Sequence, residues 1–287
     1  MYADLHCHTM RSDGAVLPEE LVRLAAAAGL PVVAITDHDT LSGTPELVSL
    51  GKELGVQVVP GVELSTLDPK TGRKAHILVY GIRNPEPITA LCDEICRSRQ
   101  AACEIMLEKT RKHYPIPREL VERWSCHSPA LFKQHIMLAL MSAGYADIMY
   151  GPLFKELFDS KKGLAYAPVH YPNVHEALEV VRASGGIPVL AHPSEYGSQA
   201  LLQELAASGE IDGVEIWHPR NPTEEIPVFV ETAEKYSLLM TGGTDFHGGN
   251  TKKCLPLGSS TAPKEQDRKS TRLNSSHTMQ SRMPSSA

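Results

Sequence analysis

Apolar positions along the first 80 residues follow two alternating patterns. Short apolar runs bounded by turn residues predict strands, and apolar residues spaced three and four apart predict the helices between them. The strands are expected at 2–8, 31–39, 56–66 and 74–82, and the helices at 18–29 and 44–55. Strands that alternate with helices are typical of an α/β fold with a mostly parallel sheet.

The alternation stops at about residue 85, and up to about residue 163 the pattern predicts helices alone, at 85–114, 129–144 and 150–163. It then resumes with helices and strands in turn, at 173–186, 187–193, 198–209, 211–219, 228–237 and 238–248. We therefore predict a barrel over residues 1–262 with a helical insertion at about 85–163. About seven strand-to-loop transitions favour a closed barrel over an open sheet.

The last segment, 263–287, differs from the rest of the chain. Between Asp267 and Ala287 the apolar residues follow no helical or strand period and stand among serines and basic residues. Such a segment buries too little apolar surface to offset the entropy of ordering it. We expect it to be disordered, and its composition resembles translated vector or adapter sequence.

Composition narrows the class of protein. The chain has 287 residues, 42% hydrophobic and 22% charged, with a net charge of −6 and no apolar run near the length that spans a bilayer. The acidic balance gives no basic surface for long nucleic acid, and the N-terminus lacks a signal-peptide pattern. The six cysteines form no CxxC pair, and those at helical spacing are expected to pack in a core. We expect a cytoplasmic protein that contacts neither membrane nor long nucleic acid.

The stretch "DLHCHTMRSDG" at 4–14 carries the first candidate chemistry. His6 and His8 are two residues apart in a predicted strand, so both side chains leave the same face and can bind one metal ion. The alternative is that an edge strand carries two histidines on a polar face without any ligand.

Seven further positions with metal-ligating side chains, taken together with His6 and His8, decide between these interpretations. The candidates lie at or just after predicted strand ends, which meet at one mouth of an α/β barrel. They are His6, His8, Asp13, His38, Glu63, His76, His192, Asp245 and His247. Six imidazoles and three carboxylates suit several divalent ions. Three such ions bring about +6 against −3, so the site would attract an oxyanion and activate water for hydrolysis of a phosphate ester.

Six motifs in order resemble those of the PHP (polymerase and histidinol phosphatase) family: "DLHCHTMRSDG", "ITDHDT", "GVELS", "HILVYG", "VLAHPSEYG" and "GTDFHG". They extend from Tyr2 to about Gly258. The resemblance implies a distorted (β/α)7 barrel that holds two or three divalent ions, with Mn favoured and Zn or Fe as alternatives, and that hydrolyses phosphate esters.

The resemblance also assigns ligands to ions. The first ion would be held by His6, His8, Glu63 and Asp245; Glu63 would bridge to a second held by His76 and His192; and Asp13, His38 and His247 would hold a third. A hydroxide shared between ions would attack phosphorus. Glu63, Asp245 and His192 are accordingly expected to be catalytic.

Substrate contacts are expected from the insertion and from one loop. In the family subgroup that cleaves nucleoside 3′,5′-bisphosphates and short RNA ends, the insertion carries an "RPHIARAL"-like stretch, which "FKQHIMLALMSAGY" resembles with Lys133 in place of Arg. The candidates are Lys133, His135, His218 and Arg220. His135 fits helix packing equally well, and a solvated loop is the alternative for the last two.

We therefore expect a small phosphorylated partner, a nucleoside 3′,5′-bisphosphate or a short nucleotide end. A cyclic phosphodiester is the second candidate. Less favoured alternatives are histidinol phosphate and a PHP module that binds without catalysing.

Overall fold

The computed structural model of the chain describes residues 2–263. The predicted disordered tail at 263–287 lies, apart from Pro263, outside the described residues.

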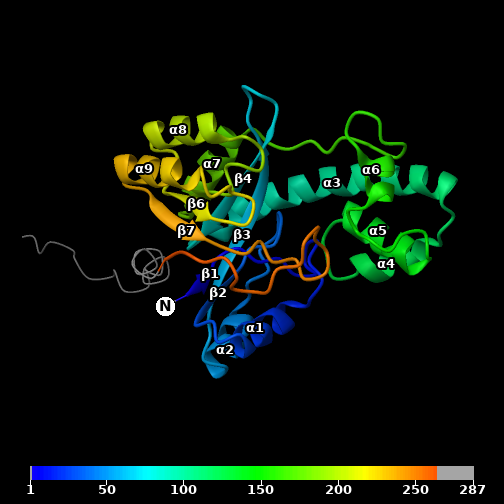
Figure 1. The fold of residues 1–287 in the computed structure, drawn as a ribbon, viewed down its shortest axis with the longest axis horizontal. Helices are drawn as coiled ribbons and strands as arrows, with labels where there is room; N and C mark the ends of the chain where they lie inside the picture. Colours follow the sequence, from blue (N-terminus) through cyan, green and yellow to red (C-terminus); the bar gives the residue numbers. More distant parts are fainter. Residues whose placement is uncertain (1, 264–287) are drawn as a thin grey trace, which may run out of the picture.

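Seven strands form one sheet in sequence order (Figure 1). They are β1 (Ala3–Asp4), β2 (Val32–Ile35), β3 (Gln57–Leu67), β4 (Lys74–Tyr80), β5 (Ile187–Leu190), β6 (Gly213–Trp217) and β7 (Leu239–Gly242). β4 runs antiparallel to β3 and β5, whereas the other paired neighbours run parallel. The reversal of β4 was not predicted, and it changes which end of β4 lies at the mouth.

Backbone hydrogen bonds close the sheet between its first and last strands. Leu5 N donates to Gly242 O at 3.2 Å, and beyond β7 His8 N donates to Phe246 O at 2.8 Å. Phe246 N returns a bond to His6 O at 3.2 Å. The predicted first strand, 2–8, is therefore regular only at Ala3–Asp4, and its second half forms the seam of the barrel. The predicted α/β barrel is confirmed.

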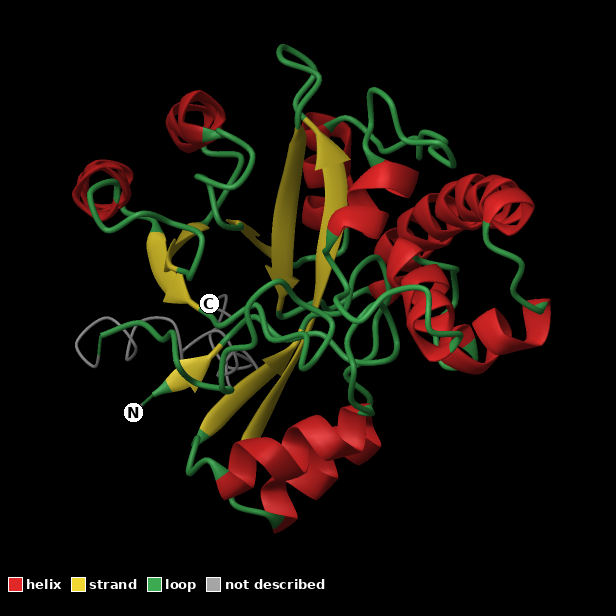
Figure 2. Cartoon of the chain, turned by 45° about the vertical axis from the view of Figure 1, so that its right-hand side comes forward, coloured by secondary structure: helices red, strands yellow, loops and turns green. Residues whose placement is uncertain are grey.

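Two groups of helices cover the barrel (Figure 2). They are α1 (Pro18–Ala27) and α2 (Pro45–Glu53) on one side, and α7 (Val174–Ala183), α8 (Gln199–Ser208) and α9 (Ile226–Tyr236) on the other. Leu21 and Leu47 pack with Val33 under the first strands, while Leu178 and Phe229 belong to a separate core around the later strands. Each helix buries one apolar stripe against the sheet.

The helical insertion lies between β4 and α7 and has a core of its own. Its helices are α3 (Pro85–His113), α4 (Arg118–Ser125), α5 (Lys133–Ser142) and α6 (Pro152–Phe158). The first turns of α3 bury Ile88 in the barrel core, and its later turns bury Leu107 against Ile136 of α5. The pattern did not predict α4, a short helix that buries only Val121 fully.

The cysteines behave as expected from their spacing. Cys92, Cys96 and Cys103 are buried and free, as is Cys7, and none of the six forms a disulfide. Among residues 2–263, no helix combines the length and the apolar character needed to cross a membrane.

Candidate metal centre

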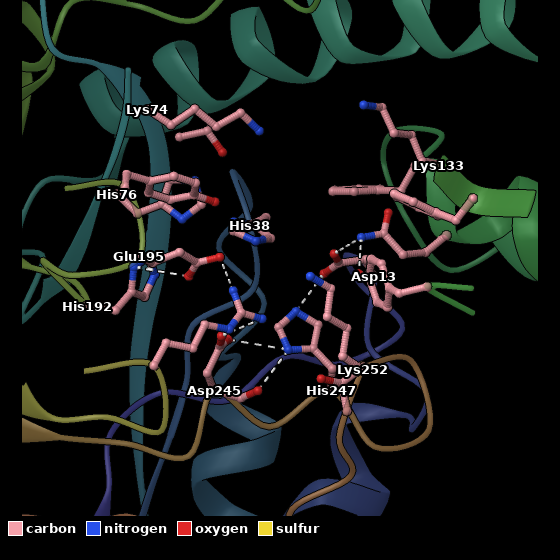
Figure 3. Close-up of a pocket in the computed structure, with 18 of the residues that line it drawn as sticks. Asp13, His38, Lys74, His76, Lys133, His192, Glu195, Asp245, His247 and Lys252 are labelled. Atoms are coloured by element: carbon pink, nitrogen blue, oxygen red, sulfur yellow. Dashed lines mark hydrogen bonds and ion pairs between the residues drawn. The ribbon is translucent and has the colours of Figure 1, made fainter. Parts of the chain in front are cut away.

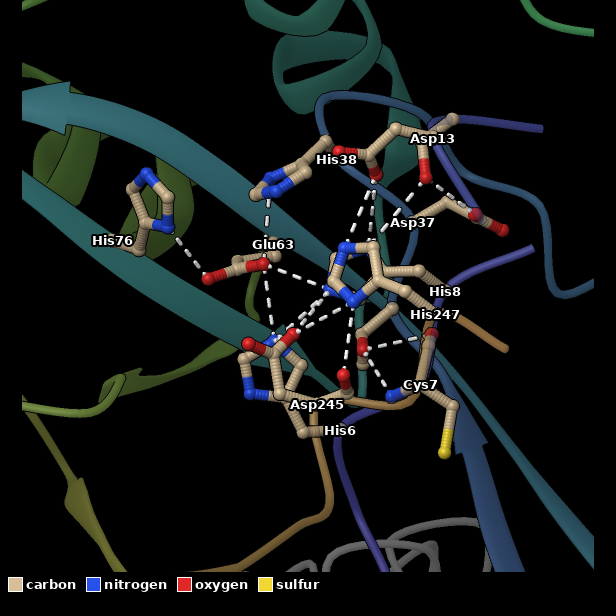
Figure 4. Close-up of polar contacts among 12 residues, drawn as sticks. His6, Cys7, His8, Asp13, Asp37, His38, Glu63, His76, Asp245 and His247 are labelled. Carbon is tan, nitrogen blue, oxygen red and sulfur yellow. Dashed lines mark hydrogen bonds and ion pairs between the residues drawn. The ribbon is translucent and has the colours of Figure 1, made fainter. Parts of the chain in front are cut away.

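All nine predicted ligands converge at the mouth of the barrel where the parallel strands end (Figure 4). Glu63 lies within β3, and His76 lies near the start of β4. Because β4 is reversed, its start is at the same mouth as the ends of the parallel strands. The register pairs Ser65 with His76, which brings the imidazole diagonally next to the Glu63 carboxylate on the same face.

A first group surrounds the Nε2 atoms of His6 and His8, which are 3.1 Å apart. Both atoms lie 3.0 Å from Oε2 of Glu63, and Asp245 Oδ1 is 3.6 Å from the first and 3.3 Å from the second. All four side chains are buried, with that of Asp245 the most exposed at 8%. These are the residues that the family resemblance assigns to the first ion.

Glu63 connects this group to a second one. Its Oε1 lies 2.7 Å from His76 Nδ1 and 3.0 Å from His192 Nε2, while its Oε2 faces the first group. A carboxylate whose two oxygens face different ligand groups can bridge two ions.

A third group lies on the other side of His8. Asp13 Oδ1 is 3.3 Å from His247 Nε2 and 3.9 Å from His8 Nδ1, and ligand atoms of these three residues and His38 lie within 4.8 Å of one another. The structure thus places His8 between the first and third groups, with one ring nitrogen facing each.

The donor atoms fit divalent ions. Asp13 Oδ1, His38 Nδ1 and His192 Nδ1 are buried without a hydrogen-bond partner, although buried polar atoms normally have one. The Nε2 atoms of His6 and His8 are 3.1 Å apart, and both face Oε2 of Glu63. A cation shared by these three atoms explains this arrangement. A set of nitrogen and carboxylate oxygen donors suits Mn, Zn or Fe.

Electrostatics at the site follow from burying opposite charges together. Burial would lower the pKa of His8, but the carboxylates of Asp245 and Glu63 outweigh it and raise that pKa to about 10. Burial would raise the pKa of Glu63, but the neighbouring imidazoles of His6 and His38 hold it well below its usual value. Ion binding would therefore displace protons from the imidazoles while the carboxylates stay ionised.

Buried hydrogen bonds hold the loops that carry the ligands. Asp37 accepts bonds from Thr9 N at 2.6 Å and from Ser12 Oγ at 2.7 Å, which fixes the loop that leads to Asp13. These bonds give Asp37 a structural role in the loop next to the ligands. Asp245 has a φ of 52° and His192 a φ of 24°, a left-handed backbone that is strained for these residues and common at functional sites.

The predicted substrate contacts divide into three that line one cavity and one that does not. Lys133, His218 and Arg220 line the cavity. His135 is buried, and its Nδ1 accepts a bond from Phe132 N at 3.2 Å at the start of α5. The structure thus places His135 in helix packing, away from the cavity, because its ring turns back to cap its own helix.

The cavity has a volume of about 1890 Å³ and lies between the barrel mouth and the insertion (Figure 3). Asp245 and His247 lie at one end, and Lys74 and Lys133 at the other. The insertion side also presents the rings of Phe132, Phe158 and Tyr166. The space is larger than one phosphate requires, so it can hold a substrate that reaches from the ligands to the insertion.

Sequence reasoning missed several polar residues of this site. Glu195 lies 3.4 Å from His192 Nδ1, Arg99 of α3 pairs with Asp39, and Glu215 lies behind His6. The signal for Glu215 was a single carboxylate in the otherwise apolar strand "GVEIW". Arg99 had no such signal, because an arginine on a long helix is usually exposed.

Comparison with known proteins decides the family. The PHP domain profile matches residues 4–171 of the chain. The chain belongs to the PHP family.

Relatives of this PHP chain act on phosphate esters. A phosphoribosyl 1,2-cyclic phosphate 1,2-diphosphodiesterase of Eggerthella lenta is 36% identical over 86% of this chain and 95% of its own. A 5′-3′ exoribonuclease of Haemophilus influenzae is 30% identical over 85% and 89%. A 3′,5′-nucleoside bisphosphate phosphatase of Chromobacterium violaceum is 27% identical over 85% and 86%.

A solved structure supports the same family assignment. A protein of Bifidobacterium adolescentis, named as a candidate metal-dependent phosphoesterase, superposes with a TM-score of 0.81 at 30% identity, covering 93% of this chain and 94% of its own. This PHP protein is a hydrolase of phosphate esters that uses divalent metal ions, so the alternative of a non-catalytic module is wrong.

Proposed function

We propose that this PHP protein hydrolyses a phosphate ester in a small nucleotide-like compound that carries a second phosphate. The observation that carries the proposal is the two-ended cavity, with the ligand groups at one end and a cationic, aromatic wall at the other. We propose two to three bound ions, with Mn favoured. When bound, such ions withdraw charge from phosphate oxygens and activate water.

Lys133 is the strongest candidate for the second phosphate. Its Nζ lies 5.1 Å from the ring centre of Tyr166 and 6.0 Å from that of Phe158. Among residues 2–263, no carboxylate is within ion-pair distance of it, and the nearby charged side chains are Lys74 and Arg99. Burial and these cations lower the pKa of Lys133 to about 8, so it is still mainly cationic at neutral pH. A second phosphate would supply the missing counter-charge.

His218 is suited to contact the phosphate that is cleaved. Arg220 N donates to His218 Nδ1 at 3.1 Å, so in the neutral ring the proton is on Nε2. That nitrogen is buried without a hydrogen-bond partner, 3.5 Å from Asp245 Oδ2 and next to the ligand groups. It would donate to a phosphate oxygen bound there.

Arg220 is a weaker candidate than its sequence position indicated. Its guanidinium pairs with Glu195 and lies 3.6 Å from Asp245 Oδ2. Because its charge is already matched, we assign it to holding the loop at the mouth and not to the second phosphate.

Two substrate classes fit this geometry. A nucleoside 3′,5′-bisphosphate or a short nucleotide end places a base and a second phosphate towards the insertion, where aromatic rings line the wall. A cyclic phosphodiester is the second candidate, because the Eggerthella lenta relative is named for a substrate with both a phosphoribosyl group and a cyclic phosphate.

A panel of substrates tests the proposal. The Mn²⁺-loaded protein would be assayed with a nucleoside 3′,5′-bisphosphate, phosphoribosyl 1,2-cyclic phosphate, histidinol phosphate and an aryl phosphate, together with analogues of the first two that lack the second phosphate. We expect removal of the second phosphate to lower kcat/KM for whichever class is the substrate. Equal kcat/KM values with and without that phosphate in both classes would overturn the proposal.

A further inference from the structure

Glu215 is a fully buried carboxylate behind the first ligand group. It lies on β6 with 0% of its surface exposed. Its Oε1 is 3.0 Å and its Oε2 3.2 Å from Nδ1 of His6, and its Oε2 also accepts a bond from the backbone N of His192 at 3.0 Å. One carboxylate therefore contacts a ligand of the first group and a ligand of the second.

The contact with His6 determines which ring nitrogen can bind an ion. An ionised carboxylate only accepts hydrogen bonds, so Nδ1 of His6 must carry a proton. Nε2, which faces His8 and Glu63, then presents its lone pair to the first group.

Packing prevents both side chains from moving away. A Cβ atom added at Gly243 would clash with His6 and lie 3.0 Å from Oε1 of Glu215, so the backbone of the loop after β7 lies directly against the pair. The bond from His192 N likewise holds a residue whose φ of 24° is unfavourable. These contacts restrict how far either side chain can turn.

We propose that Glu215 is a positioning residue that fixes the Nδ1-protonated form of His6 and the backbone of His192, and so sets the ion affinity of two ligand groups. Carboxylates that orient metal-binding histidines in this way commonly change affinity by about 10- to 100-fold. The inference rests on metal binding at this site and is independent of which substrate is cleaved.

Another arrangement would make Glu215 an ion ligand itself. Ligand atoms of His6, Glu215 and His218 lie within 4.8 Å of one another. In that case His6 would have to turn its Nδ1 lone pair towards an ion and lose the proton that Glu215 accepts. The two arrangements differ in whether His6 keeps an Nδ1 proton in the metal-loaded protein, which can be measured.

The test compares Glu215→Gln with Glu210→Gln. Glu210 contacts Nδ1 of His175 at 2.7 Å away from the ligand groups, so its substitution removes the same charge beside a different histidine. Zn²⁺ affinity would be measured by chelator competition on the full chain. We expect Glu215→Gln to lower affinity by about 10- to 100-fold and Glu210→Gln to leave it unchanged.

A second measurement tests the proposal even if the variant folds poorly, because it is made first on the wild-type protein. In the Zn²⁺-loaded wild-type protein with ¹⁵N-labelled histidine, His6 should show a slowly exchanging, hydrogen-bonded Nδ1 proton, which Glu215→Gln should expose to faster exchange. The proposal is overturned if this proton is absent from wild type, which would make Glu215 a ligand. It is also overturned if folded Glu215→Gln binds Zn²⁺ as tightly as wild type. Neither result depends on turnover.

Discussion

The two ends of the cavity differ in what they are made of and in where the chain supplies it. The barrel end consists of imidazoles and carboxylates that contact one another, and the strands at the mouth and the loops after them supply them all. The insertion end consists of aromatic rings and Lys133 from the insertion together with Lys74 from the start of β4, and among the described residues neither lysine has a carboxylate within ion-pair distance. Under the proposed function, the barrel end would perform the hydrolysis and the insertion end would select the ester.

One residue joins the two ends. Arg99 of α3 pairs with Asp39, next to the ligand His38, and donates to Ser65 Oγ at 3.0 Å. The Arg99 guanidinium lies 4.4 Å from the centre of the Phe132 ring in the insertion. The insertion thus packs against the loop that presents a metal ligand, which allows the two ends to keep a fixed spacing.

The largest effect is expected from removing the bridging carboxylate. Glu63→Ala should reduce turnover to background and lower the number of bound ions, because Glu63 contacts both the first and second groups. Elemental analysis after loading with Mn²⁺ and turnover of an aryl phosphate would measure both. Glu53→Ala, an exposed site on α2, is the matched control. Full metal content and turnover in Glu63→Ala would show that Glu63 does not bridge two ions needed for hydrolysis.

The next effect concerns stability. Arg99→Met should lower the free energy of unfolding by about 3–5 kcal/mol, because it leaves the buried Asp39 without its cation. Urea unfolding measures this, with the exposed neighbour Arg97→Met as control. Adding Asp39→Asn to Arg99→Met should recover part of the loss. If Arg99→Met is no less stable than Arg97→Met, the Arg99–Asp39 pair contributes nothing to the free energy of unfolding.

A change of pH is expected to have a smaller effect, on the preference for a bisphosphate over an aryl phosphate. The pKa of Lys133 is lowered to about 8 by burial and by Lys74 and Arg99, with Cys103 and Tyr166 as the other titratable groups facing it. Its cation is lost as pH rises through that value, while a phosphate stays ionised. The ratio of kcat/KM for a bisphosphate to that for an aryl phosphate should fall about tenfold between about pH 7 and about pH 9, since kcat/KM reports the free enzyme.

Lys133→Arg provides the control for the pH effect. Arginine stays protonated over this range, so the ratio should become nearly independent of pH. Taking the ratio removes titrations at the ligand groups that affect both substrates. A wild-type ratio that stays constant would contradict the assignment of Lys133 to the second phosphate.

The two ends also differ in how far the sequence predicts them. Motifs such as HxH place ligands at strand ends, so the barrel and the convergence of its candidates follow from local pattern and family resemblance. The roles of the nine ligands stay predictions. The reversal of β4 was not predicted, because strand direction depends on pairing between residues distant in sequence. Its consequence is that His76 reaches the mouth from the start of its strand.

The insertion end was predicted only in outline. The helical pattern is local, but the faces that line the cavity depend on how α3, α5 and the segment after α6 pack together. For that reason His135 could not be separated from Lys133 by spacing, although the structure buries the first and brings the second to the cavity. Glu215 and Arg99 were missed because each acts through a contact with a residue far along the chain.

The most direct test of the division between hydrolysis and selection is Lys133→Ala in the Mn²⁺-loaded protein. The kcat/KM of a nucleoside 3′,5′-bisphosphate and of an aryl phosphate would be measured for wild type, for Lys133→Ala and for the exposed control Lys161→Ala. Lys133→Ala should lose about 2–3 kcal/mol on the bisphosphate, roughly 30- to 150-fold, and almost nothing on the aryl phosphate. Equal losses on both substrates would contradict the account, because Lys133 would then support the structure without recognising a second phosphate.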